Sequence, residues 1–119
     1  MMNIVVHVHD GVAKHGYEMG TRQAWKCGDK AHEVYRVLGV IKGRVVSIIE
    51  DVTAELSTFD NNPEHHSGSE GRYIFLGGKC WNEKQIFAPD MPRFMFKKIK
   101  GLNQGHRYFS DAELEANLS

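Results

Sequence analysis

Short apolar runs at the start of the chain predict a strand followed by an irregular segment. The run 3–9 ends at the turn-forming pair Asp10-Gly11, which is typical of a strand. Alternation divides this strand between two faces, with Ile4, Val6 and Val8 on one and Val5, His7 and His9 on the other. Glycines interrupt residues 10–29, so we expect irregular structure there with only a short helical turn over 21–26.

The segment 30–56 fits both a helical and a strand period. Apolar residues at helical spacing indicate two helices over 30–41 and 44–56, the first with Asp29 and Gly39 as its caps. The many β-branched residues favour strands instead. We favour a hairpin over 33–54, with its tight turn at Lys42-Gly43.

The polar stretch 60–71 is rich in turn-forming residues and predicts a mobile surface loop. Strands are expected over 72–77 and 93–99. A turn at Gly77-Gly78 would join the first of these strands to a partner over 80–87.

The C-terminal end predicts a short helix near 110–117, because Ser110 and Glu113 are spaced as a capping box. A chain of 119 residues has the length of one domain. We therefore expect residues 1–119 to form a small α+β domain with a mainly antiparallel sheet and one or two short helices.

Charge is balanced over the whole chain but not along it. Lys plus Arg and Asp plus Glu both number 15, which argues against a globally basic nucleic-acid coat. Residues 91–109 carry five basic and no acidic side chains, whereas 110–119 carry three acidic and no basic ones. This contrast indicates either a local anion-binding surface or two elements that pair with each other.

Aromatic rings and cations are interleaved in the basic segment, a combination suited to single-stranded nucleic acid. The candidate binding residues are Arg93, Phe94, Phe96, Lys97, Lys98, Lys100, Arg107 and Tyr108. If the strands 72–77 and 93–99 pair, their rings would line one face, which resembles the aromatic sheet of RNA-recognition domains in kind, although neither strand matches the signatures of those domains. The alternative is that the rings belong to the core and the lysines form a solvated edge.

His7 and His9 are the candidate metal ligands. Histidines at i and i+2 on one strand share a face and could converge on a divalent transition metal. Two ligands do not complete a site, so the alternative is an exposed polar face. The pair His65-His66 falls in the polar loop, where we expect it to be solvated. The sequence Gly77-Gly78-Lys79 lacks the spacing of a phosphate-binding loop.

Three features resemble one known family. The opening strand carries His7 or His9, Tyr35 to Gly39 reads Tyr-Arg-Val-Leu-Gly, which is similar to a Tyr-x-x-x-Leu-Gly pattern but one residue shorter, and Phe87 to Asp90 is similar to a Phe-x-Asp-Pro-Asp turn. Together they resemble the vicinal oxygen chelate proteins, and the resemblance implies a metal-ligand histidine and a helix that ends at Gly39. The spacing to Leu38, the missing first aspartate and the lack of a placed glutamate ligand depart from that family, so its fold is not carried over.

No signal-peptide or membrane-spanning pattern is present, and Cys27 and Cys80 are too few for a disulfide framework. We expect a cytoplasmic protein with reduced thiols and no membrane partner. The expected function is a small binding module for nucleic acid, a nucleotide or an acidic protein. The alternatives are a phage or mobile-element accessory or inhibitor protein that acts on another protein, and a small metal-dependent enzyme that uses His7 and His9.

Overall fold

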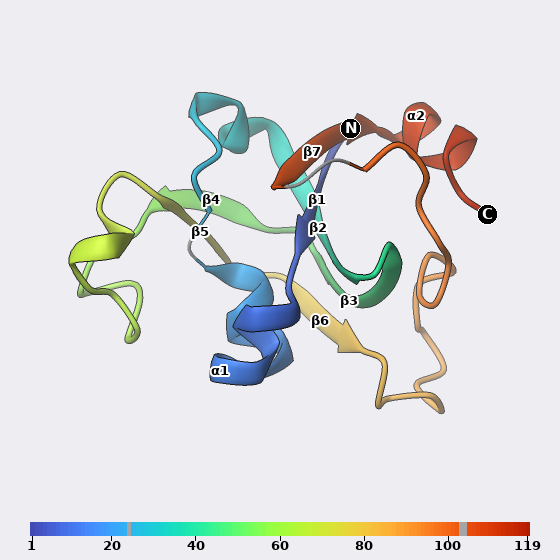
Figure 1. The fold of residues 1–119 in the computed structure, drawn as a ribbon, viewed down its shortest axis with the longest axis horizontal. Coiled ribbons are helices and arrows are strands. Elements are labelled where there is room, and N and C mark those ends of the chain that lie inside the picture. The colour runs from blue at the N-terminus through green and yellow to red at the C-terminus, as the bar shows by residue number, and fades with distance from the viewer. Residues whose placement is uncertain (24, 103–104) are drawn as a thin grey trace.

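The computed structural model describes residues 1–23, 25–102 and 105–119 (Figure 1). Its helices and strands, in chain order, are β1 (Met2–His7), α1 (His9–Arg22), β2 (Val34–Ile41), β3 (Arg44–Glu50), β4 (Thr53–Leu56), β5 (Tyr73–Leu76), β6 (Lys79–Asn82), β7 (His106–Ser110) and α2 (Asp111–Ala116). Short 3₁₀ turns lie at Asp29–Glu33 and Ser67–Ser69.

The centre of the molecule is a mixed sheet of five strands in the order β6-β3-β2-β1-β7. Strands β1 and β2 are parallel, and every other neighbouring pair of this sheet is antiparallel. Helix α1 lies in the connection between β1 and β2, as a parallel pair requires a crossover. Strands β4 and β5 form a second, antiparallel sheet. The predicted α+β class with mainly antiparallel pairing is confirmed.

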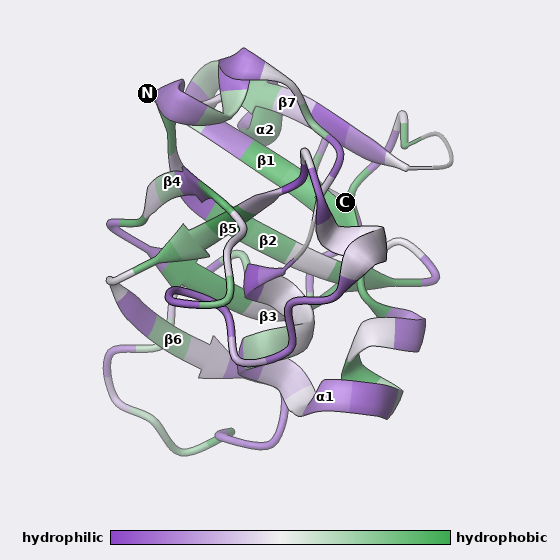
Figure 2. Cartoon of the chain, turned by 90° about the vertical axis from the view of Figure 1, so that its left-hand side faces the viewer, coloured by the Kyte–Doolittle hydropathy of each residue, from purple (hydrophilic) through white to green (hydrophobic). Residues whose placement is uncertain are grey.

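Both faces of the central sheet are covered (Figure 1). On one face, Ile4 and Val6 of β1 pack beneath α1 and the sheet of β4 and β5. On the other face, Val5 packs in a second cluster with Phe94 and Leu114. Figure 2 shows that β1, β2 and β3 are apolar along most of their length. A sheet buried on both faces requires such continuous apolar strands, which explains why they do not alternate cleanly.

The predicted hairpin is confirmed as β2 and β3. Its two-residue turn is formed by Lys42 at φ 52° and Gly43 at φ 77°. Positive φ at both central positions is the type I′ pattern, whose twist matches that of the flanking strands. The β-branched content of this segment therefore outweighed its helical spacing.

The prediction for the N-terminal segment is wrong after His7. Strand β1 ends there, and residues expected to be irregular form α1, which begins at His9 and is kinked at Gly16 with φ 84°. The kink brings the backbones of Gly11 and Gly20 together, and a Cβ at Gly20 would lie 2.6 Å from the carbonyl carbon of Gly11. These glycines permit close packing of the two halves of the helix. An interpretation of glycine as a helix breaker overlooks this role.

The predicted strand over 93–99 is also wrong. Its start is a series of turns in which Met95 N–H donates to the Pro92 carbonyl and Lys97 N–H to the Phe94 carbonyl. Phe96 adopts φ 68°, which breaks the extended alternation. This segment does not pair with β5, whose partner is β4.

The turn at Gly77-Gly78 joins strands of two different sheets. Strand β5 pairs with β4, whereas β6 pairs with β3, so the expected hairpin over 72–87 is wrong. A Cβ at Gly78 would lie 1.9 Å from the Glu50 carbonyl oxygen, so the chain can cross there only with glycine. The segment from Tyr35 to Gly39 lies within β2, which contradicts the helix implied by the resemblance to vicinal oxygen chelate proteins.

Candidate functional site

Cations of the basic segment gather beside the turn between β2 and β3. Ile99 N–H donates to the Gly43 carbonyl at 2.9 Å, and Val45 N–H donates to the Lys97 carbonyl at 2.9 Å. Arg44 and Lys98 are partners in an isolated antiparallel bridge. The two segments run side by side (Figure 1). We call their combined side chains the basic surface, defined as Lys42, Arg44, Phe96, Lys97, Lys98 and Lys100.

The three predicted lysines keep exposed side chains on this surface. Lys97, Lys98 and Lys100 are all exposed, and among the described residues no carboxylate lies within ion-pair distance of them. Arg44 pairs with Glu83 at 3.0 Å and remains 43% exposed. The basic surface therefore carries more positive than negative charge, although the chain as a whole is neutral.

Phe96 is the aromatic side chain of the basic surface. It is 41% exposed, and the Arg44 guanidinium lies 6.0 Å from its ring centre. A non-glycine residue at φ 68° pays roughly 1–2 kcal/mol for the left-handed conformation. In this conformation the Phe96 N–H donates to the Val45 carbonyl at 3.0 Å, which fastens the segment to β3.

Phe94 and Tyr108, also predicted as binding residues, lie elsewhere. Phe94 is 7% exposed and belongs to the core, with the guanidiniums of Arg36 and Arg93 within 4.8 Å of its ring centre. Tyr108 packs against the opposite core, and its hydroxyl donates to the Cys27 carbonyl at 2.6 Å. The interpretation that rings belong to the core therefore holds for Phe94, because the turns after Pro92 aim it inward.

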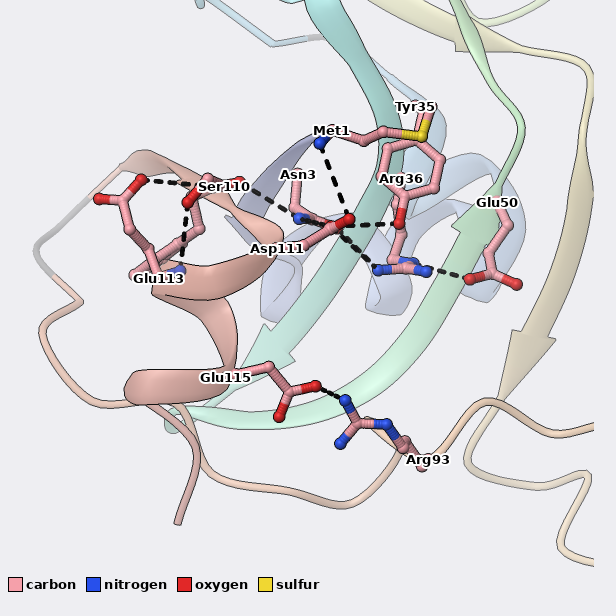
Figure 3. Close-up of polar contacts among 11 residues, drawn as sticks. Met1, Asn3, Tyr35, Arg36, Glu50, Arg93, Ser110, Asp111, Glu113 and Glu115 are labelled. Atoms are coloured by element: carbon pink, nitrogen blue, oxygen red, sulfur yellow. Dashed lines mark hydrogen bonds and ion pairs between the residues drawn. The ribbon is translucent and has the colours of Figure 1, made fainter.

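Arg93 and Arg107 hold the C-terminal part of the chain. Arg93 pairs with Glu115 of α2 (Figure 3), and Arg107 donates to the Gly101 carbonyl. Backbone bonds add to this contact, because Lys100 N–H donates to the Asn117 carbonyl at 2.7 Å. The basic and acidic segments thus pair in part, while the lysines stay open to solvent.

His7 and His9 do not share a strand face as expected. His7 ends β1, whereas His9 is the first residue of α1 and is 77% exposed with Nδ1 3.2 Å from an oxygen of Asp10. Across the described ranges, no group of three or more His, Cys, Asp and Glu side chains is placed to hold a metal ion. The geometry on which the metal hypothesis rested is therefore absent.

The expectation that the loop histidines are solvated is wrong for His65. Its side chain is 2% exposed, with Nδ1 2.8 Å from the Ser57 hydroxyl and Nε2 3.1 Å from a Glu70 oxygen. Asn62 donates to the same hydroxyl at 2.9 Å. This polar network therefore anchors the loop. Its bond between Ser57 and His65 joins residues that are eight positions apart in the sequence. The short spacing of Ser57, His65 and Glu70 was the only signal of it in the sequence.

The hydrogen-bonded chain of Ser57, His65 and Glu70 has the residue types of a hydrolase triad. Ser57 is 5% exposed, its hydroxyl accepts from Asn62, and neither of the two described cavities is lined by it. A nucleophile must reach its substrate, so this network supports the loop and does not form a reactive centre.

The two cysteines are not activated nucleophiles. Burial raises the pKa of the Cys27 thiol and of the Cys80 thiol above the ordinary value. A raised pKa keeps the sulfur in its neutral, unreactive form at neutral pH. Cys80 instead accepts a hydrogen bond from the buried guanidinium of Arg22 at 3.1 Å.

No family model, curated protein or solved structure matches this chain significantly. None of the helices in the described part of the chain has the length and apolar character needed to cross a bilayer.

Proposed function

We propose that this protein is a small binding module that recognises a polyanion through its basic surface, and that single-stranded nucleic acid is the ligand. The observation that carries the proposal is Phe96, a strained and 41% exposed ring placed among lysines. A single strand needs both cations for its phosphates and a ring on which a base can stack. A smooth acidic protein surface would need the cations but not the ring.

The lysines support this proposal because they have no competing partners. A lysine already paired with a carboxylate must break that pair before it binds a phosphate, which reduces the net gain. Among the residues that the structure describes, Lys97, Lys98 and Lys100 have no such pair. They can therefore attract a polyanion at long range even though the net charge of the chain is zero.

A second candidate is an accessory or inhibitor protein that binds another protein. It is favoured by Ile86 and Phe87, which follow β6 and are 61% and 91% exposed. Adjacent exposed apolar side chains are typical of a contact surface for a protein partner. This surface does not include the lysines, so the two candidates can be tested separately.

The test is the binding of a fluorescein-labelled single-stranded oligonucleotide, measured by anisotropy at increasing salt. We expect the affinity to fall with salt, with a slope no steeper than about −3.5, since each single-strand phosphate contact contributes roughly −0.7. That limit follows from the five cations of the basic surface, which are Lys42, Arg44, Lys97, Lys98 and Lys100. Salt-insensitive or absent binding would contradict the proposal and leave the protein partner as the better candidate.

A matched pair of triple variants separates local from overall charge. Replacing Lys97, Lys98 and Lys100 by Gln should weaken binding and flatten the salt slope. The control replaces three exposed lysines on other parts of the surface, Lys26, Lys30 and Lys84, by Gln. Both variants change the net charge equally, so equal losses of affinity would mean that the basic surface is not the binding site.

A further inference from the structure

A groove of about 580 Å³ lies along β4 and the turn that follows it, on the side of the molecule that faces the viewer in Figure 2. Three parts of the chain form its walls, represented by His32 of the first 3₁₀ turn, Glu55 of β4 and Tyr73 of β5. An enclosed apolar space of roughly 150 Å³ already holds benzene, so this groove has room for an aromatic side chain. It is separate from the basic surface, because no residue of that surface lines it.

Large apolar side chains are exposed beside the groove. Leu56 lines it and is 53% exposed, and Phe59, which follows the lining residue Thr58, is 75% exposed. The Phe59 ring meets the ring of the buried His65 edge-on, with 4.5 Å between their centres, which gives the exposed ring a defined position. Exposed apolar side chains that border a hollow are typical of a contact surface for another molecule.

The groove is acidic. Residues 45–71 carry six acidic side chains and neither Lys nor Arg. Two of these acidic residues, Glu55 and Asp60, line the groove and are exposed. Across the described ranges, no cation lies within ion-pair distance of either carboxylate, whereas Glu50 pairs with Arg36. The two carboxylates of the groove are therefore available to a partner.

The cations nearest to the groove in the sequence lie outside it. Lys30 is in the same 3₁₀ turn as His32, but its ammonium lies 5.2 Å from the ring centre of Tyr108 on β7. Arg72 precedes β5 and borders the hollow beside α1. Neither cation lines the groove. The groove therefore fits a partner that presents an apolar side chain among cations, because complementary charges steer association and fix its register.

A second copy of this chain presents a surface of that kind. The basic surface combines the 41% exposed ring of Phe96 with the exposed side chains of Lys97, Lys98 and Lys100. The five basic side chains of residues 91–109 nearly balance the six acidic side chains around the groove. Two copies can therefore attract each other through these surfaces although the net charge of each is zero.

The two surfaces face different ends of the molecule. Figure 1, drawn with the longest axis horizontal, places β4 and the loop after it on the left and the turn between β2 and β3 on the right. A single contact between two copies therefore leaves a groove free on one copy and a basic surface free on the other. Such a head-to-tail contact extends to further copies unless a ring closes.

We propose that the groove beside β4 binds the basic surface of a second copy of this chain. The Phe96 ring of that copy enters the groove next to Leu56, and its lysines lie against Glu55 and Asp60. The proposal needs only the ring and the cations of the basic surface, so it does not rest on the binding of nucleic acid. Because both partners use the same cations, a bound single strand and a second copy compete for them.

The first test is sedimentation velocity of the whole protein over a wide range of concentration, at low and at high salt. We expect the average mass to rise with concentration at low salt. Added sodium chloride should reverse this rise, because it screens charges at the surface. A protein that stays monomeric at every concentration would overturn the proposal and leave a cationic segment of a different protein as the candidate occupant of the groove.

Two variants locate the contact. The groove variant carries Glu55→Gln and Asp60→Asn, and the lysine variant carries Lys97→Gln, Lys98→Gln and Lys100→Gln. All five positions are exposed, so both variants should fold as the wild type does. Each variant alone should stay monomeric, because it lacks one of the two surfaces.

A mixture of the two variants is the decisive measurement. The groove variant keeps its basic surface and the lysine variant keeps its groove, so the mixture should form a 1:1 dimer that does not extend further. Two variants that stay monomeric when mixed would overturn the proposal.

A matched control separates the groove from overall charge. Asp10→Asn together with Glu64→Gln changes the net charge as the groove variant does, at two exposed carboxylates that do not line the groove. This control should self-associate as the wild type does and should form no dimer limited to 1:1 with the lysine variant. A loss of self-association equal to that of the groove variant would place the contact outside the groove and overturn the proposal.

Discussion

Asn62 Nδ2 donates a 2.6 Å hydrogen bond to the side-chain oxygen of Gln23, and this bond ties the loop before β5 to the end of α1. The same amide donates to Ser57 at 2.9 Å, and the Asn62 oxygen accepts from Glu64 N–H. Asn62 is fully buried. One side chain therefore connects Gln23, at the end of α1, to the network around His65.

Removal of this connection should destabilise the fold. Asn62→Ala leaves buried oxygens of Gln23 and Ser57 without their donor, and we expect a loss of about 1–3 kcal/mol in the free energy of unfolding. Urea unfolding measures this loss. Ser67→Ala, at an exposed position in the same loop, should change stability by less than about 0.5 kcal/mol. Equal effects of the two substitutions would mean that the network does not stabilise the loop.

The glycines of α1 should differ sharply in their tolerance of alanine. Gly20→Ala would place a methyl group within 2.6 Å of the Gly11 backbone. Neither of the two backbone segments of α1 can move away without a large loss of stability. No atom lies within 4 Å of the position that a Cβ at Gly16 would take, so Gly16→Ala costs only the backbone strain of φ 84° and ψ 175°, about 1–3 kcal/mol. Thermal unfolding should therefore rank Gly20→Ala well below Gly16→Ala. The reverse ranking would contradict the close approach of the two helical halves.

The parts of the fold that the sequence predicts are those set by local chemistry. The hairpin of β2 and β3 follows from β-branched residues around Lys42-Gly43, and Ser110 begins α2 with its side chain accepting from Glu113 N–H. Helix α1 is not predictable in this way, because its glycines serve a contact between Gly11 and Gly20 that only the folded chain creates.

The candidate site could be predicted only in part for the same reason. The charge run identified Lys97, Lys98 and Lys100, but the positive φ of Phe96 separates that ring from Phe94, which alternation places on the same face. Arg44 joins the basic surface through a β-bridge to Lys98, which lies 54 positions later in the sequence. Asn62 likewise joins Gln23, at the end of α1, to Ser57 before the loop, a contact that no local pattern encodes.

Asp111 should make the stability of the protein depend on acid pH. A 2.9 Å hydrogen bond from Asn3 lowers the pKa of this carboxyl, and Tyr35 and Arg36 add to the effect (Figure 3). A lowered pKa means that the folded state favours the carboxylate. The stabilisation is therefore complete above the pKa of the unfolded chain, about 3.9, and is lost as the pH falls through the lower pKa of the folded state.

Asp111→Asn should remove this dependence. The side chain is 49% exposed, so we expect a loss of only about 0.5–1 kcal/mol at pH 7. Urea unfolding of both proteins should show the difference shrinking below about pH 4. Asp60→Asn, in an exposed loop, serves as the control. A difference that stays constant down to the lowest pH would show that Asp111 acts through packing and not through its charge.

The two phenylalanines of the basic segment should separate folding from binding. Phe94 is buried in the core, so Phe94→Ala should cost about 3–5 kcal/mol of stability. Phe96→Gly should change stability by less than about 1 kcal/mol, because relief of the left-handed strain offsets the lost contacts of a ring that is 41% exposed.

The same Phe96→Gly variant should lose binding to the single-stranded oligonucleotide. Loss of one stacked base corresponds to about 1–3 kcal/mol, while the salt slope stays unchanged because no cation is removed. Anisotropy titrations at several salt concentrations measure both quantities. Lys97→Gln is the complementary variant, and it should flatten the slope without affecting the stacking contribution. The contrary result is a Phe96→Gly variant that is strongly destabilised but whose folded fraction binds the oligonucleotide with normal affinity. It would mean that the ring serves the fold and that the strain at Phe96 has no role in recognition.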